Sequence, residues 1–357
     1  MYCELRKTLQ WENPMSEAGA LARNLERNAA RRYDRFLNDD ERLLPEERVR
    51  LEAAAALLDE SDRIACISSP QGIFASSRMC EPDTAIEYFE GAFAVAAIET
   101  GKKPKSRAAA IWSAKGDRSY RIDPAGDGDW ELAYSAPVLD GYLPIDTRCP
   151  ATQGIIPGVD SGAEPIDEAT ESDILALLFT AYALVESGSP LARRFLEDFA
   201  RVMVARNSRA DEGFHSGGAR VTAGRMVMTN PLFARDKPEL ITDGLVHESI
   251  HCAIDHCEFV APILTVVQTD AAIVSPWTGK LLDINTFIHA SFVWYGLVHF
   301  WTLANARTSQ PTPGALEMLA TARRGFIRAR PSELIAPFTD LLNPDVTRAL
   351  GEMEMPG

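Results

Sequence analysis

The stretch at 285–304, NTFIHASFVWYGLVHFWTLA, constrains the fold of this chain more than any other feature. It has the length of a helix, is rich in aromatic residues and is almost uninterrupted in apolar character. A helix that is apolar on every side has to be enclosed by other elements. With 46% apolar residues among 357, the chain can build such a core, as one large domain or as two.

Local patterns predict the other elements. We expect helices at 16–60 (two, split near Pro45), 85–98, 174–186 and 191–205, and strands at 64–67, 108–112, 120–122, 130–134 and 225–229. The predicted fold is therefore α+β and predominantly α-helical. It divides into a mixed N-terminal region with a small mixed sheet, 1–150, and a helical C-terminal domain, 173–357.

Charge is distributed unevenly along the chain. Between 123 and 173 there are twelve carboxylates and one cation, Arg148, so this stretch carries −11 of the net −15. The Gly/Pro-rich part, 151–172, is predicted to be a solvated linker or, alternatively, a docking surface for a basic partner. The acidic balance argues against a nucleic-acid partner.

The chain shows no sign of a membrane or secretory destination. Its longest apolar stretch, 174–185, is about half of the roughly 20 residues that a membrane-spanning helix needs. The N-terminus lacks the features of a secretory signal, and the six cysteines contain no CxxC pair. We expect a cytoplasmic protein with reduced, mostly buried thiols.

All six histidines lie between 215 and 299, and two of them belong to the HExxH pattern His-Glu-Ser-Ile-His at 247–251. A helix that starts near Pro238 would place His247 and His251 one turn apart on one face, where both can bind one metal ion. Glu248, rotated by about 100°, would act as a base or would support the ligands. The alternative is an accidental match whose histidines only satisfy hydrogen bonds in the core.

A metal ion needs a third ligand. The position that metzincins use is Cys257, and 261–277 lacks the glutamate of thermolysin-like enzymes. We expect His289, inside the buried 285–304 helix, to be the third ligand, and we disfavour His299. Glu258 depends on where the HExxH helix ends, and His256 points to another face and is structural.

Four segments together resemble a known family. They are AGRMVMTNP (223–231), LVHESIH (245–251), SPW (275–277) and IHASFVWYG (288–296), and they look like the HExxH domain of bacterial clusters for ribosomally made, modified peptides. The resemblance implies a non-haem Fe(II), 2-oxoglutarate-dependent dioxygenase that uses O2 to hydroxylate a peptide side chain, at Cβ. It also implies a metal-ligating histidine twelve residues after Trp277, which is His289. We expect Trp277 and His215 to face the substrate. The region 1–150 would recognise the substrate or a leader peptide, and 173–357 would be the metal-binding catalytic domain.

The chain departs from this family at two positions. Where relatives carry arginines after the SPW tryptophan, this chain has Thr278 and Leu282. Either Lys280 and Arg225, the nearest cations by sequence, bind 2-oxoglutarate instead, or the co-substrate has changed. One competing hypothesis is a zinc metallopeptidase or other hydrolase in which Glu248 deprotonates metal-bound water. Another is a binding or scaffold module with a structural HExxH.

Overall fold

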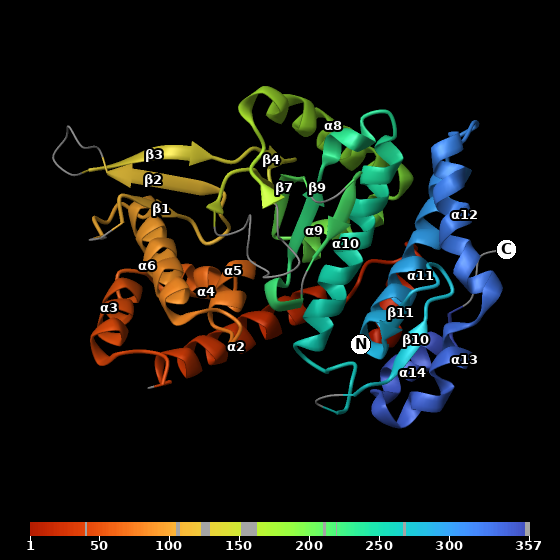
Figure 1. Cartoon of the computed structure of the whole chain (residues 1–357), viewed down its shortest axis with the longest axis horizontal. Helices are drawn as coiled ribbons and strands as arrows, with labels where there is room; N and C mark the ends of the chain where they lie inside the picture. The colour runs from red at the N-terminus through yellow and green to blue at the C-terminus, as the bar shows by residue number, and fades with distance from the viewer. Residues whose placement is uncertain are drawn as a thin grey trace.

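The computed structural model describes residues 1–39, 41–104, 108–122, 129–150, 163–209, 212–218, 220–266 and 269–353. The fold is α+β and mostly helical, with 58% helix and about 14% strand in small sheets, which confirms the predicted class. Figure 1 shows the HExxH helix, α10, running through the middle of the molecule between a sheet and a second long helix.

The N-terminal part is a set of helices followed by a small sheet. The helices are α1 (Tyr2–Thr8), α2 (Ala18–Leu37), α3 (Pro45–Ala55), α4 (Glu60–Ile67), α5 (Pro70–Ala75) and α6 (Pro82–Glu99). The strands β1 (Ala110–Trp112), β2 (Arg118–Ile122) and β3 (Trp130–Ser135) pair antiparallel in sequence order. The split near Pro45 and all three strands are confirmed, but this sheet is antiparallel rather than mixed.

The strand predicted at 64–67 is wrong, because these residues close helix α4. The Asp59 side chain accepts a hydrogen bond from the Asp62 backbone N–H and caps that helix, and two further acids occupy the first turn. A four-residue apolar run fits a strand or one buried turn of helix equally well. The cap upstream of the run decides between them.

A second sheet lies beside α10. Its strands run in the order β4 (Val138–Leu139), β5 (Leu143–Asp146), β7 (Val202–Ser208), β9 (Arg225–Thr229) and β8 (His215–Gly217), and β6 (Ala163–Glu164) pairs with β7. The predicted strand at 225–229 is confirmed. The helix predicted at 191–205 is wrong in its last third, because α9 ends at Phe199 and β7 starts with two β-branched residues, Val202 and Val204. The C-terminal half is therefore not helical throughout.

Long helices form the rest of the molecule. They are α8 (Glu168–Gly188), α9 (Pro190–Phe199), α10 (Pro238–Glu258), α11 (Ile284–Ala306), α12 (Pro313–Arg328), α13 (Pro331–Ile335) and α14 (Pro344–Gly351). Short 3-10 turns, η1 (Arg220–Thr222), η2 (Pro231–Ala234) and η3 (Ala336–Leu341), join some of them, and β10 (Ala272–Val274) and β11 (Leu281–Asp283) form a hairpin before α11. The helices expected at 85–98, 174–186 and 285–304 are confirmed.

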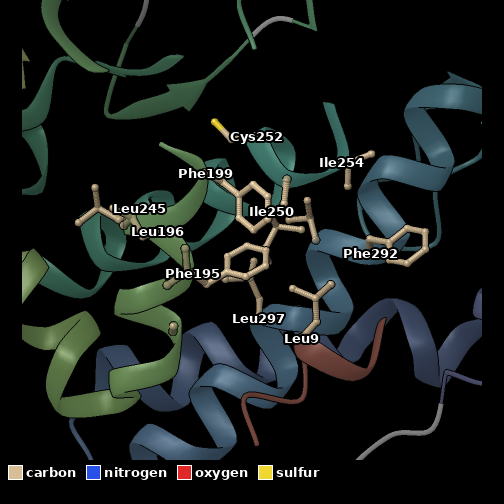
Figure 2. Packing of buried hydrophobic residues seen from close by; sticks show 14 of the residues in the cluster. Leu9, Phe195, Leu196, Phe199, Leu245, Ile250, Cys252, Ile254, Phe292 and Leu297 are labelled. Atoms are coloured by element: carbon tan, nitrogen blue, oxygen red, sulfur yellow. The ribbon is translucent and has the colours of Figure 1, made fainter. Parts of the chain in front are cut away.

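Two hydrophobic clusters organise the packing. In the larger one, Leu9 and residues of α9, α10 and α11 interlock, as Figure 2 shows. The smaller one joins α2 to α6. The division into domains at residue 150 stays a prediction. The larger cluster contains residues from before and after this position, among them Tyr2 in α1, Leu143 in β5 and Leu350 in α14.

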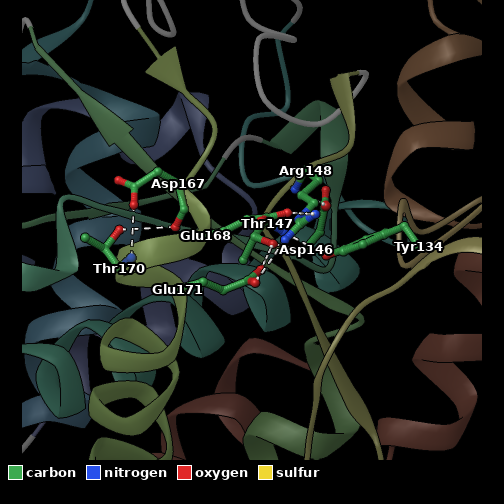
Figure 3. A network of polar contacts seen from close by, with 8 residues as sticks. All are labelled: Tyr134, Asp146, Thr147, Arg148, Asp167, Glu168, Thr170 and Glu171. Atoms are coloured by element: carbon green, nitrogen blue, oxygen red, sulfur yellow. Dashed lines mark hydrogen bonds and ion pairs between the residues drawn. The ribbon is translucent and has the colours of Figure 1, made fainter.

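Part of the acidic stretch has a structural partner. Arg148, just after β5, reaches Glu168 and Glu171 at the start of α8, each at 3.1 Å, and Thr147 donates to Glu171 at 2.6 Å (Figure 3). These contacts tie the first turn of α8 to the end of β5. Of the predicted linker, 151–162 lies outside the described residues, and from Glu168 onward the chain is already helical.

Two further expectations concern the whole chain. All six cysteines lie in the described ranges, where none forms a disulfide and five are buried, as expected. Among the helices that the structure describes, none is both long and apolar enough to cross a bilayer.

Candidate metal centre

Helix α10 carries four potential ligands on one face. Pro238 occupies its first turn, where a missing N–H breaks no intrahelical bond, and the helix continues unbroken for 21 residues to Glu258. Positions 247, 251, 255 and 258 recur every three or four residues, so their side chains share a face. That face presents His247, His251, Asp255 and Glu258.

Helix α11 brings His289 to this face. Its Nδ1 lies 3.2 Å from Nδ1 of His251, and the two rings are stacked at 24° with centroids 5.4 Å apart. The Asp283 side chain caps α11 by accepting from the Thr286 backbone N–H, and the buried apolar surface of α11 packs against α10. The histidine predicted as third ligand therefore lies beside the HExxH helix.

A carboxylate lies behind His289. The Nε2 of His289 is 3.1 Å from Oε2 of Glu258, whose other oxygen pairs with Arg220 Nη1 at 3.2 Å. A carboxylate paired with a guanidinium acts as an acceptor, so Nε2 of His289 carries the proton and Nδ1 presents its lone pair to His251. Metal-ligating histidines are typically oriented by such a partner.

Asp255, Glu258 and His289 form a second grouping, with one potential ligand atom of each within 4.8 Å of the others. All three residues are buried. Burial raises the pKa of the Asp255 carboxyl to about 7, while the nearby His289 lowers it. Sequence reasoning missed Asp255 and left Glu258 open; the signal that could have found both is the absence of a helix breaker before Pro262.

His247 lies on the more open side of the centre. Its ring centroid is 5.0 Å from that of His251, and its side chain is 28% exposed. Burial lowers the pKa of His247 to about 4 and that of His251 well below its usual value, where neighbouring histidines add to the effect. Both imidazoles are therefore neutral near pH 7, which is the form that binds metals.

Glu248 points away from solvent. Its carboxyl is 1% exposed, accepts a hydrogen bond from Ser216 of β8 at 2.8 Å, and lies 3.8 Å from Nε2 of His247. Burial raises the pKa of this carboxyl to about 8. A Cβ on Gly218 would come within 3.3 Å of the second carboxyl oxygen. Gly218, which has no side chain, therefore packs closely against the Glu248 carboxyl. The placement suits a group that orients its neighbours.

Trp277 lies one layer behind the centre. It is 6% exposed, donates its indole N–H to the Ala322 carbonyl at 2.9 Å, and stacks on Trp294 with the ring centroids 5.9 Å apart. Trp294 in turn meets His247 edge-on at 6.3 Å. The half-buried Trp294, which sequence reasoning did not single out, is thus the aromatic ring next to the histidines.

The other predicted site residues are more scattered. His215 is exposed on β8, and its neighbour Ser216 is the residue that reaches Glu248. Arg225 is buried on β9, with its carbonyl beside Gly218, whereas Lys280 is exposed between β10 and β11. A further cation, Arg328 of α12, donates to the Pro276 carbonyl within the SPW segment at 2.9 Å.

The remaining two histidines have packing roles. His256 contacts the Cys252 carbonyl through Nδ1 at 2.7 Å and packs edge-on against Phe199, as expected of a structural residue. His299 packs against Tyr295, nearly three helical turns beyond His289. Cys252 and Cys257 lie in the larger hydrophobic cluster.

The donor set fits a metal ion on the Nδ1 side of His289. Two imidazole nitrogens 3.2 Å apart can share an ion at ordinary metal–nitrogen lengths of about 2.1 Å. Neutral imidazoles suit iron and zinc alike. The three residues of the grouping on the Nε2 side are all buried, and one of them, Glu258, is already paired with Arg220.

Comparisons with known proteins add no relative. Neither a scan against protein-family models nor a search of curated proteins gives a match. The family resemblance therefore rests on the motif residues of this chain.

Proposed function

We propose that this protein is a non-haem Fe(II), 2-oxoglutarate-dependent oxygenase that acts in the cytoplasm and hydroxylates a side-chain carbon, Cβ, of a ribosomally made peptide. The observation that carries the proposal is the approach of His289 Nδ1 to His251 Nδ1, with Glu258 fixing the far side of the His289 ring. Trp277 of the SPW segment supports the proposal as well, because it stacks on Trp294, which contacts His247.

The protein's own residues would then have distinct tasks. His247, His251 and His289 would hold Fe(II), and Glu258 with Arg220 would keep His289 in the tautomer that binds it. Bound iron with 2-oxoglutarate and O2 would supply the oxidising power for C–H hydroxylation. Glu248 and Ser216 would fix the orientation of His247, and Trp294 would form an apolar wall against bulk water.

A cation is needed for the far carboxylate of 2-oxoglutarate, since Thr278 and Leu282 replace the expected arginines. Lys280 and Arg225 remain the proposed residues. Arg328 is a third choice, because its guanidinium lies against Pro276, next to the tryptophan that stacks behind the centre. Comparing Lys280→Gln, Arg225→Gln and Arg328→Gln for 2-oxoglutarate affinity identifies the residue.

A zinc hydrolase fits this arrangement less well. Its mechanism requires the HExxH glutamate to reach metal-bound water and take its proton. Here the Glu248 carboxyl is buried against β8, where it accepts the Ser216 hydrogen bond. This contact favours an orienting role.

The test is anaerobic titration of Fe(II)-loaded protein with 2-oxoglutarate, followed by the weak visible charge-transfer band of the bidentate complex. We expect a band in the wild type and in His215→Ala, an exposed histidine outside the ligand set, and none in His289→Ala. Admission of O2 should then release succinate. No band in the wild type, together with tight zinc binding, would overturn the proposal in favour of a hydrolase.

A further inference from the structure

A groove of about 830 Å³ lies where the end of α2 and the segment after it face the residues that follow α5. Four arginines line it, two on α2 and two on the facing segments: Arg32, Arg35, Arg42 and Arg78. Asp39 and Glu41 line it as well, so the lining carries a net charge of about +2 by simple count, four cations against two acids. The chain as a whole carries −15, so this local sign is reversed.

The arginines of the groove are held without neutralising partners. Arg42 donates to the Cys80 carbonyl at 2.6 Å and lies over the Phe36 ring, and Arg35 donates to the Arg31 carbonyl. Within the described ranges none of the four forms an ion pair with a carboxylate, unlike Arg50, which pairs with Glu90 at 2.8 Å. Two of the four, Arg35 and Arg78, are exposed.

The groove lies next to the end of the metal-binding helix. Arg32 lies over the ring of Phe259, the residue after Glu258, at 4.5 Å, and Asn28 donates to the Phe259 carbonyl at 2.8 Å. In Figure 1, α2 passes beneath the C-terminal end of α10. From there Arg220, Glu258 and His289 connect to the histidine face through the contacts given above. One end of the groove, at Arg32, therefore lies against the residue that follows α10.

We propose that this groove binds an acidic segment of a peptide. Guanidinium groups match carboxylates with paired hydrogen bonds, and the neutral side chains of the lining, Asn38, Ser76 and Ser77, suit peptide main-chain groups. The volume accommodates a few residues carrying two or three carboxylates. A nucleic acid carries its charge along its whole length and would meet the acidic surface beyond the groove.

The inference that the groove binds the substrate rests on the proposed function. Binding of an acidic peptide in the groove requires no metal. The experiment uses full-length metal-free protein and fluorescence anisotropy of a labelled Gly-Glu-Gly-Glu-Gly-Glu peptide, with the corresponding Gln peptide as a neutral comparison. We expect the Glu peptide to bind at least tenfold more tightly than the Gln peptide, and raising the salt from about 50 to 300 mM to weaken it severalfold. Equal binding of the two peptides would overturn the proposal.

Charge-reversed variants locate the site. Arg35 and Arg78 are exposed, so Arg35→Glu/Arg78→Glu should fold with an unchanged Tm and lose at least tenfold in affinity. Arg27→Glu, also exposed on α2 but outside the groove, is the matched control and should lose less than twofold. An unaffected double variant would overturn the location, and tighter binding of polyphosphate of equal charge would overturn the peptide class. Absence of oxygenase activity would contradict the proposed function but would not affect the peptide preference or the location of the binding site.

Discussion

At the scale of single residues, the centre depends on what lies behind each imidazole. His289 has a defined partner on each nitrogen, Glu258 on one side and His251 on the other. His247 has an aromatic edge and a buried carboxyl beside it. These surroundings, and not the HExxH letters alone, make the three rings converge.

Glu248→Gln separates orientation from base catalysis. The glutamine oxygen can still accept the Ser216 hydrogen bond, so we expect Fe(II) affinity within about threefold of the wild type and retained 2-oxoglutarate-dependent succinate release. Chelator competition measures the Fe(II) affinity, and a succinate assay measures the turnover. A variant that binds metal normally but has lost all turnover would show that the carboxyl takes part in chemistry.

Asp243, one helical turn before His247 on α10, gives a pH-dependent prediction. Burial raises its pKa to about 6, although the hydrogen bond from the Trp301 indole opposes this shift. Because the pKa of this carboxyl is higher in the folded protein than in the unfolded chain, the folded state is destabilised as the pH rises from about 4 to about 6. Asp243→Asn should therefore match the wild type near pH 4 and exceed it by on the order of 2 kcal/mol at pH 7.

Urea unfolding of both proteins from pH 4 to 8 measures this difference. Asp173→Asn, an exposed acid at the start of α8, serves as control and should give a small difference at every pH. A gap between Asp243→Asn and the wild type that does not change with pH would contradict the buried-carboxyl explanation.

At the scale of elements, the centre is a product of helix packing. α10 supplies one face, α11 supplies His289 and Trp294, and α12 closes the rear by packing Gly325 against Trp277. A Cβ at Gly325 would stand 2.2 Å from the indole ring, which is rigid and enclosed. Only glycine lets α12 approach this closely.

Gly325→Ala should therefore cost stability even though alanine favours helices. Overpacking against a fixed ring typically costs about 1–3 kcal/mol. Gly19→Ala, in α2 with its nearest neighbour at 3.5 Å, is the matched control and should be neutral or stabilise by about 0.5–1 kcal/mol. Urea unfolding measures both, and equal effects at the two sites would contradict the packing argument.

The elements that sequence predicted well are those with long, consistent patterns. The helices at α6, α8, α10 and α11 have many apolar positions and clear starts, such as Pro238. Errors fell where a short apolar run is ambiguous, at 64–67, and where a helix passes directly into a strand at 200–202. In both places local propensity is compatible with either state, and tertiary packing decides.

The site was predictable only in part for a similar reason. Spacing along one helix predicts that His247 and His251 share a face, and the same rule extends to Asp255 and Glu258. Which rings of α11 meet that face depends on the crossing of two helices, which one-dimensional spacing does not define. For this reason Trp294 and the Glu258–His289 contact emerge only from the three-dimensional structure.

At the scale of the whole molecule, the N-terminal helix belongs to the larger hydrophobic core, together with α10 and α11. Tyr2, Leu5 and Leu9 of the first segment are fully buried, and Trp11 donates its indole N–H to the Gly296 carbonyl in α11 at 2.8 Å. The Tyr2 hydroxyl donates to the Ala261 carbonyl, close to the end of α10. The first residues thereby contact α11 and the chain just past the end of α10, the two helices that carry the candidate ligands.

Leu5→Ala tests this long-range role. Removing a fully buried leucine side chain should lower the free energy of unfolding by about 2–5 kcal/mol. Leu44→Ala, at a leucine that is 57% exposed, should change it by less than about 0.5 kcal/mol. Thermal or urea unfolding reports both, and a small effect at Leu5 would mean that α1 is not docked in solution.

The most direct test of the central claim is the equilibrium Fe(II) affinity of five single variants under anaerobic chelator competition. If the ion is held on the histidine face, His247→Ala, His251→Ala and His289→Ala each lose binding, Glu258→Gln weakens it about 10–100-fold by releasing His289, and Asp255→Asn leaves it nearly unchanged. Abolished binding in Asp255→Asn and Glu258→Gln with normal binding in His247→Ala would instead place the ion among Asp255, Glu258 and His289, and would contradict the three-histidine centre.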